Sequence, residues 1–180
     1  MVESKSTSLV ETFQKWFPLR IASVSDIPHP AMMANCIDFS VDELALLAKG
    51  MISLCRKEQG VGLAAVQCGI PLNIFVASAD SLNFRCFFDV DYESDEEKQD
   101  SLESCLSLYD KNRKLRRFMV KRFGNARFHG KELFFNNSPA SVAEINEDLS
   151  GLFAVVCQHE ADHGKGILIS DHGKEVEVLY

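Results

Sequence analysis

Apolar side chains recur at helical spacing in the segment that follows Ser40. They are Leu44, Leu47, Met51, Leu54 and Cys55, which share one face of a helix. The S-V-D-E sequence that begins at Ser40 has the pattern of a capping box, and Gly60 is a suitable stop. The pattern predicts an amphipathic helix over about residues 41–58.

Shorter runs rich in β-branched and aromatic residues occupy the middle of the chain and predict strands. The expected strands are Asn73–Ala77, Phe84–Val90, Phe118–Phe123 and Glu132–Phe135. Phe128–Lys131 is expected to form a turn, and the acidic stretch at 92–100 a solvated loop. A second helix is predicted from about Leu149 through His163. We therefore expect an α+β fold with small β-sheets packed around this C-terminal helix.

Length and composition favour a single globular domain spanning residues 1–180. Of these residues 46% are hydrophobic, and we expect residues 1–18 to form an N-terminal arm. A net charge of −7 argues against nucleic acid as a partner. The Lys and Arg residues between 111 and 122 are accordingly expected to form a solvated strand face.

Nothing in the sequence predicts insertion into a membrane. No apolar run reaches the ~20 residues that cross a bilayer, and the N-terminus lacks the pattern of a secretory signal. We expect a cytoplasmic protein without membrane contact, and an organellar location stays open.

The sequence His159-Glu160-Ala161-Asp162-His163 lies inside the second predicted helix. Side chains four residues apart share a helix face, so His159 and His163 can bind one metal ion. Glu160 would stand beside that ion, where it can take a proton from water. Burying these polar side chains next to the apolar run at 152–157 would be costly without such a partner. Asp162 either orients a ligand histidine or pairs with a nearby base, and the sequence does not separate these roles.

A catalytic ion of this kind usually takes three protein ligands, so a third is required. A histidine three residues after Gly166, as in metzincins, is absent because Ile169 stands there. A glutamate from a downstream helix is a strained alternative, because only seventeen residues follow His163. An upstream ligand fits better, and the candidate is Cys105 within the segment E-S-C-L-S at 103–107.

Three segments resemble motifs of the peptide deformylase family and occur in the family's order. The segment E-S-C-L-S at 103–107 is similar to the E-G-C-L-S box, and H-E-A-D-H at 159–163 matches H-E-x-D-H. The segment G-V-G-L-A-A-V-Q at 60–67 matches G-x-G-x-A-A-x-Q. The resemblance extends over about residues 19–170.

The resemblance implies a role for each matching residue. The metal ligands would be Cys105, His159 and His163. Glu160 would act as general acid and base, and Gln67 and the backbone amide of Leu106 would stabilise the oxyanion. The residues that bind the substrate peptide would be Gly60, Val61, Gly62 and Ser104. The two glycines also have a plain interpretation as helix-stop and turn residues.

The implied reaction removes the formyl group from N-formylmethionyl peptides or nascent chains. A water whose pKa the metal lowers from ~15.7 toward ~7 would attack the formyl carbon. Glu160 would accept the proton of this water and return it to the departing amine. Family members commonly use one Fe²⁺ ion in the cell, and Zn²⁺, Ni²⁺ or Co²⁺ suit the same ligands.

The chain also departs from the family pattern. Ser104 stands where the family usually has glycine, which puts the shape of the substrate groove in question, and Val66 replaces a frequent proline. Leu108-Tyr109-Asp110 replaces the valine-proline-glycine that often follows the second box. The sequence ends at Tyr180, whereas many bacterial members continue into a C-terminal helix thought to help ribosome docking. We therefore expect a short form of the family, and transient ribosome association stays open.

Two other functions remain open. A metallopeptidase that cuts internal peptide bonds would share H-E-x-x-H but would not need Cys105 or the segment at 60–67. A catalytically weak, deformylase-like binding protein would fit the departure at Ser104, but Gln67 and Glu160 are intact.

Overall fold

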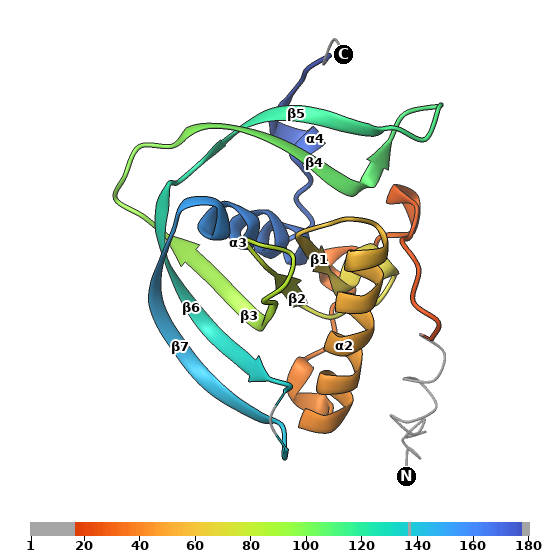
Figure 1. The fold of residues 1–180 in the computed structure, drawn as a ribbon, viewed down its shortest axis with the longest axis vertical. Helices are drawn as coiled ribbons and strands as arrows, with labels where there is room; N and C mark the ends of the chain where they lie inside the picture. Colours follow the sequence, from red (N-terminus) through yellow and green to blue (C-terminus); the bar gives the residue numbers. More distant parts are fainter. Residues whose placement is uncertain (1–16, 137, 178–180) are drawn as a thin grey trace.

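Two antiparallel sheets lie around a central helix in the computed structural model, which describes residues 17–136 and 138–177 (Figure 1). The five-stranded sheet has the order β1-β2-β3-β6-β7, and its strands are β1 Gly62–Ala64, β2 Ile74–Ala77, β3 Arg85–Glu93, β6 Asn125–Phe134 and β7 Ser141–Ser150. The three-stranded sheet has the order β4-β5-β8, and its strands are β4 Gln99–Tyr109, β5 Leu115–Arg122 and β8 Lys174–Glu175. Neighbouring strands run antiparallel in both sheets.

The helices differ in length and place. They are α2 Val41–Lys57, α3 Gly151–Gly164 and the single-turn α4 Ile169–His172. Short 3₁₀ turns are η1 Val24–Asp26, η2 Pro30–Met32, η3 Cys36–Asp38 and η4 Ala65–Cys68. Figure 1 shows α3 in the middle of the molecule, between the five-stranded sheet and the long hairpin of β4 and β5.

The start of α2 is fixed by the capping box that the sequence contains. Ser40 Oγ accepts a hydrogen bond from the Glu43 backbone N–H (3.3 Å), and Glu43 Oε2 accepts one from the Ser40 N–H (2.8 Å). Two N–H groups that the first helical turn would leave without partners are satisfied in this way. The apolar face of α2 is buried and packs against β1, β2 and β6.

Helix α3 is buried around almost its whole circumference after its first turn. Ala154 and all residues of 156–163 are buried, and the helix packs mainly against β1 and β2. The polar side chains of H-E-A-D-H therefore lie in the interior, where each needs a partner.

The expected turn at Phe128–Lys131 is wrong, because these residues lie inside β6. Gly130 has a φ of +150°, and it faces the irregular part of β3 where the pairing register shifts between Phe88 and Asp91. A Cβ atom at Gly130 would lie 2.7 Å from the backbone oxygen of Asp89. The glycine therefore allows two strands to approach closely and does not reverse the chain.

Two further expectations need correction, and one strand was missed. The expected acidic loop shrinks to residues 94–98, because β3 runs to Glu93 and β4 begins at Gln99. Strand β7 was not predicted, since this edge strand carries mostly exposed side chains and lacks the apolar alternation of a half-buried strand. Because β7 extends to Ser150, helix α3 begins at Gly151 and not at about Leu149.

The predicted N-terminal arm lies, except for its last two residues, outside the described residues. Within the described part of the chain, no helix combines the length and apolar character needed to cross a bilayer.

The capping box gives a direct test of the start of α2. We expect Ser40→Ala to lower the free energy of unfolding by about 0.5–2 kcal/mol, because the Glu43 N–H loses its acceptor. Urea unfolding of the purified protein measures this change. The matched control is Ser53→Ala on the exposed face of α2, for which we expect a change of less than about 0.5 kcal/mol. Equal effects of the two changes would contradict a role for the cap.

Candidate metal centre

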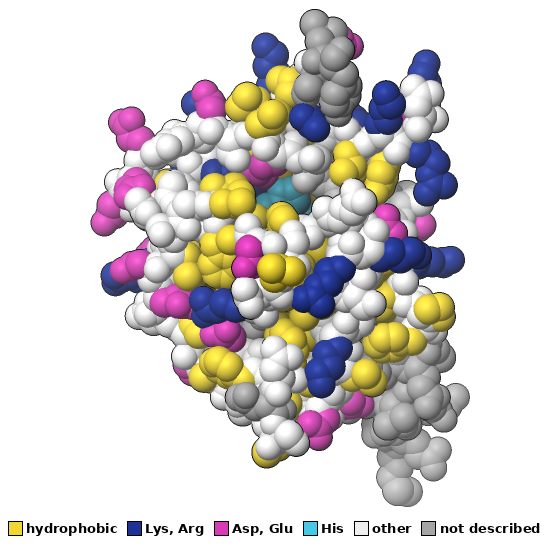
Figure 2. Space-filling model, viewed as in Figure 1, with side chains coloured by type: hydrophobic (Ala, Val, Ile, Leu, Met, Phe, Trp, Pro, Cys, Tyr) yellow, Lys and Arg dark blue, Asp and Glu magenta, His cyan; other side chains and the backbone are white. Residues whose placement is uncertain are grey.

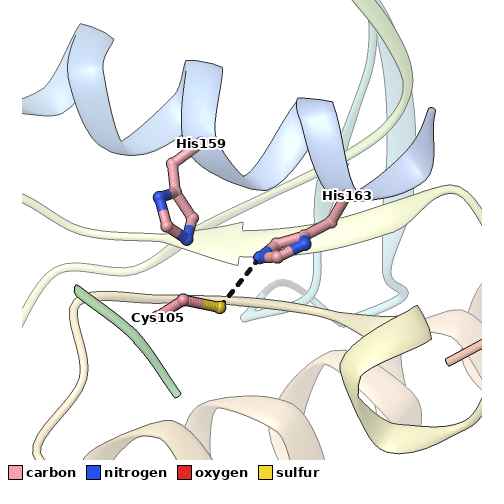
Figure 3. Close-up of side chains that lie close together, drawn as sticks. All are labelled: Cys105, His159 and His163. Atoms are coloured by element: carbon pink, nitrogen blue, oxygen red, sulfur yellow. Dashed lines mark hydrogen bonds between the residues drawn. The ribbon is translucent and has the colours of Figure 1, made fainter. Parts of the chain in front are cut away.

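Three metal-ligating side chains from two elements meet between α3 and β4. His159 and His163 lie one turn apart on α3, and Cys105 comes from β4 (Figure 3). One potential ligand atom from each residue lies within 4.8 Å of the others, and Cys105 Sγ is 3.4 Å from His163 Nε2. All three side chains are buried. A thiolate and two imidazoles in this arrangement fit a transition-metal ion.

His159 is held in orientation by a carboxylate behind it. Its Nδ1 atom lies 2.8 Å from Glu103 Oε2, so Nε2 is the ring nitrogen that remains for an ion. Burial alone would raise the pKa of Glu103, but hydrogen bonds from His159 and Arg122 outweigh it and lower that pKa to about 2. Glu103 is therefore ionised at neutral pH, and an ionised carboxylate favours the tautomer with a proton on Nδ1.

Arg122 joins the carboxylate of Glu103 to that of Asp162. Its Nε and Nη2 atoms donate to Glu103 at 3.0 and 3.2 Å, and its Nη1 atom donates to Asp162 at 2.5 Å. The residue is 3% exposed, so the expectation of a solvated basic face over residues 111–122 is wrong at this end. Strand alternation could have revealed it, because Arg122 falls on the same face of β5 as the buried Phe118 and Val120.

Glu160 lies beside the three donors and is almost wholly buried. Its side chain is buried, and its Oε2 atom has no hydrogen-bond partner among the described residues. Burial raises the pKa of Glu160 to about 7, against the opposing effect of His159. Gly62 makes room for it, because a Cβ atom at that position would lie 2.4 Å from Glu160 Oε1. A buried carboxyl with this pKa can both accept and donate a proton near neutral pH.

Gln67 presents its amide group to the same centre. Its Oε1 accepts a hydrogen bond from the Ala64 N–H (2.8 Å), which directs Nε2 toward Cys105 Sγ and Ser107 Oγ, each at 3.3 Å. The side chain is 1% exposed. Ser107 was not singled out from the sequence, although it closes the E-S-C-L-S segment. Gln67 thus offers a fixed N–H donor a few ångströms from the donor cluster.

A groove of about 270 Å³ leads from the surface to these residues. Leu106, His159 and Glu160 line this groove. All four residues expected to bind substrate line it as well, and they are Gly60, Val61, Gly62 and Ser104. Apolar side chains form much of the remaining wall, and they are Leu102, Leu115, Leu152, Val155 and Val156. Figure 2 shows a histidine at the bottom of a surface hollow with hydrophobic side chains around it.

Comparison with known proteins assigns the family. The sequence model described as "Polypeptide deformylase" matches residues 21–178. The chain belongs to the polypeptide deformylase family. The resemblance seen in the three sequence motifs is thereby confirmed.

Two relatives and one solved structure illustrate the similarity to other peptide deformylases. The chain is 34% identical over 154 residues to "Peptide deformylase" of Acidothermus cellulolyticus, which covers 86% of this chain and 77% of the relative. It is 30% identical over 137 residues to "Peptide deformylase 1" of Clostridium perfringens, which covers 76% of this chain and 85% of the relative. The crystal structure of peptide deformylase from Thermotoga maritima superposes with a TM-score of 0.69 at 25% identity, covering 86% of this chain and 96% of the other. This likeness confirms the expected α+β class, and the fold has antiparallel sheets and few helices.

The raised pKa of Glu160 predicts how the stability of the metal-free protein depends on pH. The carboxyl has a pKa of about 7 when folded and an ordinary value of 4.5, so folding favours its protonated form. The resulting stabilisation is complete below pH 4.5 and is lost as the pH rises through 7. We expect this loss to approach roughly 3 kcal/mol, and Glu160→Gln to abolish it.

Urea unfolding of both proteins, stripped of metal, at pH 4.5 and at pH 8 measures this difference. The control is the wild-type protein reloaded with metal. A difference in stability between wild type and Glu160→Gln that stays constant over this range would contradict the raised pKa.

Proposed function

We propose that this chain removes the N-formyl group from the initiator methionine of nascent polypeptides, as a metal-dependent hydrolase. The family to which it belongs consists of enzymes of this activity. The observation that carries the proposal is the convergence of Cys105, His159 and His163 beside the buried Glu160. A binding protein without turnover would not need a buried carboxyl at this place with one oxygen, Oε2, left without a hydrogen bond, because such a group is costly to bury.

Cys105, His159 and His163 would hold one divalent transition-metal ion. These donors suit Fe²⁺, which we propose for the cell, and they also suit Zn²⁺, Ni²⁺ and Co²⁺. Their burial and the orientation of His159 by Glu103 support the assignment. When bound, such an ion acts as a Lewis acid that lowers the pKa of water from ~15.7 toward ~7.

Glu160 would move the protons of the reaction. In its ionised form it accepts a proton from the water that attacks the formyl carbon. It then donates this proton to the nitrogen of the methionine as the C–N bond breaks, so that formate and a free amine leave. Burial raises the pKa of Glu160 to about 7 in the metal-free protein, and a bound cation would lower it again, which favours the ionised form that accepts the first proton.

Gln67 and Leu106 would stabilise the negative charge that develops on the formyl oxygen. The Gln67 Nε2 group is held by the Ala64 contact, so it needs little reorganisation when the charge appears. The backbone N–H of Leu106 would be the second donor, because Leu106 follows Cys105 directly and lines the groove.

The groove supports an extended peptide with an apolar first side chain. The edge strand β1 and the residues that lead into it, Gly60–Gly62, would pair with the substrate backbone, and Ser104 lines the same groove. Val155 and Val156 would form the wall against which the methionine side chain packs. Burying that side chain is worth about 1.5–3 kcal/mol, which gives preference for formyl-methionine over polar first residues.

Metal content tests the proposed ligands without reference to activity. We expect the purified protein to carry about one transition-metal ion per chain, and Cys105→Ala to lose most of it, because two imidazoles alone bind such ions less tightly. Elemental analysis of protein purified without chelators measures the content. The control is Cys68→Ala, outside the cluster, which should keep the metal. Full occupancy in Cys105→Ala would remove this residue from the site.

Substrate choice tests the activity itself. We expect the Fe²⁺-loaded protein to hydrolyse formyl-Met-Ala-Ser and to discriminate against acetyl-Met-Ala-Ser by more than the ~10–200-fold that one methylene is worth in an apolar pocket. The extra methyl group would meet side chains such as Gln67 that are held by hydrogen bonds and cannot move aside. Release of free amine, with iron kept reduced, measures both rates.

A variant at Glu160 separates chemistry from binding in the same assay. We expect Glu160→Gln to keep its metal and to lose ~10²–10⁴ in turnover, because the proton shuttle is missing. Equal hydrolysis of formyl and acetyl peptides, or faster cleavage of internal peptide bonds, would contradict the proposed function. Metal-loaded protein with no turnover of any of these peptides would favour the binding protein.

A further inference from the structure

The hydrogen bonds behind His159 continue outward to a tyrosine on a different sheet. From His159 they pass through Glu103 and Arg122 to Asp162, as described above. Asp162 uses its Oδ2 atom for Arg122, and its Oδ1 atom accepts a hydrogen bond from the Tyr92 hydroxyl at 2.8 Å. Tyr92 lies on β3, and it was not singled out from the sequence.

The tyrosine ring is itself held in place from two sides. Its centroid lies 5.5 Å from that of Phe128 on β6, and the Lys165 ammonium group lies 4.8 Å from its centroid. Lys165 also pairs with Asp91, the residue before Tyr92. Burial and the nearby Asp162 carboxylate raise the pKa of Tyr92, so the hydroxyl keeps its proton and remains a donor at neutral pH.

Asp162 depends on both of its partners because it is buried. Its carboxylate accepts one hydrogen bond from the guanidinium of Arg122 and one from the phenol of Tyr92. Without the phenol, Oδ1 would lose the only donor that the described residues offer it, and a carboxylate in this environment would turn or draw in water. Either response would change the position of Arg122, whose other two nitrogens fix the Glu103 carboxylate.

We propose that Tyr92 is a positioning residue that sets the affinity of the metal centre through Asp162, Arg122, Glu103 and His159. The inference rests on the proposed function, since it takes His159 as a metal ligand. Of the two roles that the sequence leaves open for Asp162, the structure shows pairing with a nearby base, Arg122, and the inference adds that this pair helps to orient a ligand histidine through Glu103. It also connects the metal centre to the five-stranded sheet, because Tyr92 lies on β3 and is 67 positions from His159 in the sequence.

A purely structural role for Tyr92 is the alternative. The hydroxyl could do no more than secure β3 to α3, and its removal would then lower stability without altering the centre. The two roles differ in one property, which is whether the effect of Tyr92 on metal binding requires Glu103.

The experiment measures the affinity of metal-free protein for Co²⁺ by competition with a chromophoric chelator. Visible absorption of the cobalt-loaded protein reports the coordination in parallel. Losing a direct partner of a ligand histidine typically costs 10–100-fold in metal affinity, and Tyr92 acts three residues further away. We therefore expect Tyr92→Phe to weaken Co²⁺ binding by about three- to tenfold. The matched control, Tyr109→Phe on β4, lies outside the hydrogen-bonded series and should bind Co²⁺ as wild type does.

A double-mutant comparison gives the decisive result. In a Glu103→Gln background, the carboxylate that transmits the effect is gone, so adding Tyr92→Phe should weaken Co²⁺ binding by less than twofold. An undiminished three- to tenfold loss in that background would overturn the inference, because Tyr92 would then act by another route. An unchanged affinity in Tyr92→Phe alone would also overturn it, even if unfolding shows lower stability.

The wild-type measurement distinguishes this failure from failure of the proposed function. If wild-type protein binds one Co²⁺ with a thiolate charge-transfer band and Tyr92→Phe does the same with equal affinity, the metal centre stands and only the inference falls. If wild-type protein binds no Co²⁺, the metal centre itself is wrong, and the inference falls with it.

Discussion

The buried charge of Arg122 is the constraint on which the arrangement of this molecule depends. A guanidinium that is 3% exposed must find carboxylates nearby, and it finds Glu103 on β4 and Asp162 on α3. An unpaired buried charge costs several kcal/mol, so β4, β5 and α3 are held in one relative position. Cys105 lies two residues from Glu103, and His163 follows Asp162 directly. The ion pairs therefore bring the thiol and the imidazoles together before any metal is considered.

Local pattern was sufficient for the two long helices and for the most specific chemistry. The capping box and apolar stripe gave α2, because both depend on residues within one helix. The spacing of His159 and His163 gave two donors on one face for the same reason. Cys105 was different: no rule of spacing joins it to α3, so it was reached by setting aside downstream ligands and through the resemblance to a family. Contacts between distant segments were beyond local pattern, so the pairing of Arg122 with Glu103 and Asp162 was not foreseen, although strand alternation in β5 does indicate that Arg122 is buried. Gly130 led to the wrong prediction of a turn, because glycine is favoured both in turns and where two strands approach closely.

The centre combines fixed and adjustable charges. Glu103 and Arg122 keep their charges across the neutral range, since each stabilises the other's ionised form. Glu160 stands nearby and makes no ion pair with a described residue, and burial outweighs the opposing effects of His159 and Arg122 and brings its pKa to about 7. Two glutamates of the same region thus differ in charge: Glu103 is ionised at neutral pH and is hydrogen-bonded to the His159 ring, whereas burial favours the protonated form of Glu160. The surroundings of each carboxylate, and not its identity, make the difference.

The direct passage from β7 into α3 carries a mechanical consequence. Ser150 ends the strand and Gly151 begins the helix, with a φ of +61° at the junction and no intervening loop. The ten-residue pairing of β7 with β6 therefore fixes where the helix begins and which way each of its side chains points. One residue added within β7 would turn every later side chain of α3 by about 100°, carrying both imidazoles away from Cys105. The same addition in the connection between β6 and β7 would leave the pairing of the two strands, and with it the orientation of α3, unchanged. An exposed, polar edge strand that contributes no residue to the candidate metal centre thus determines whether the two histidines face Cys105.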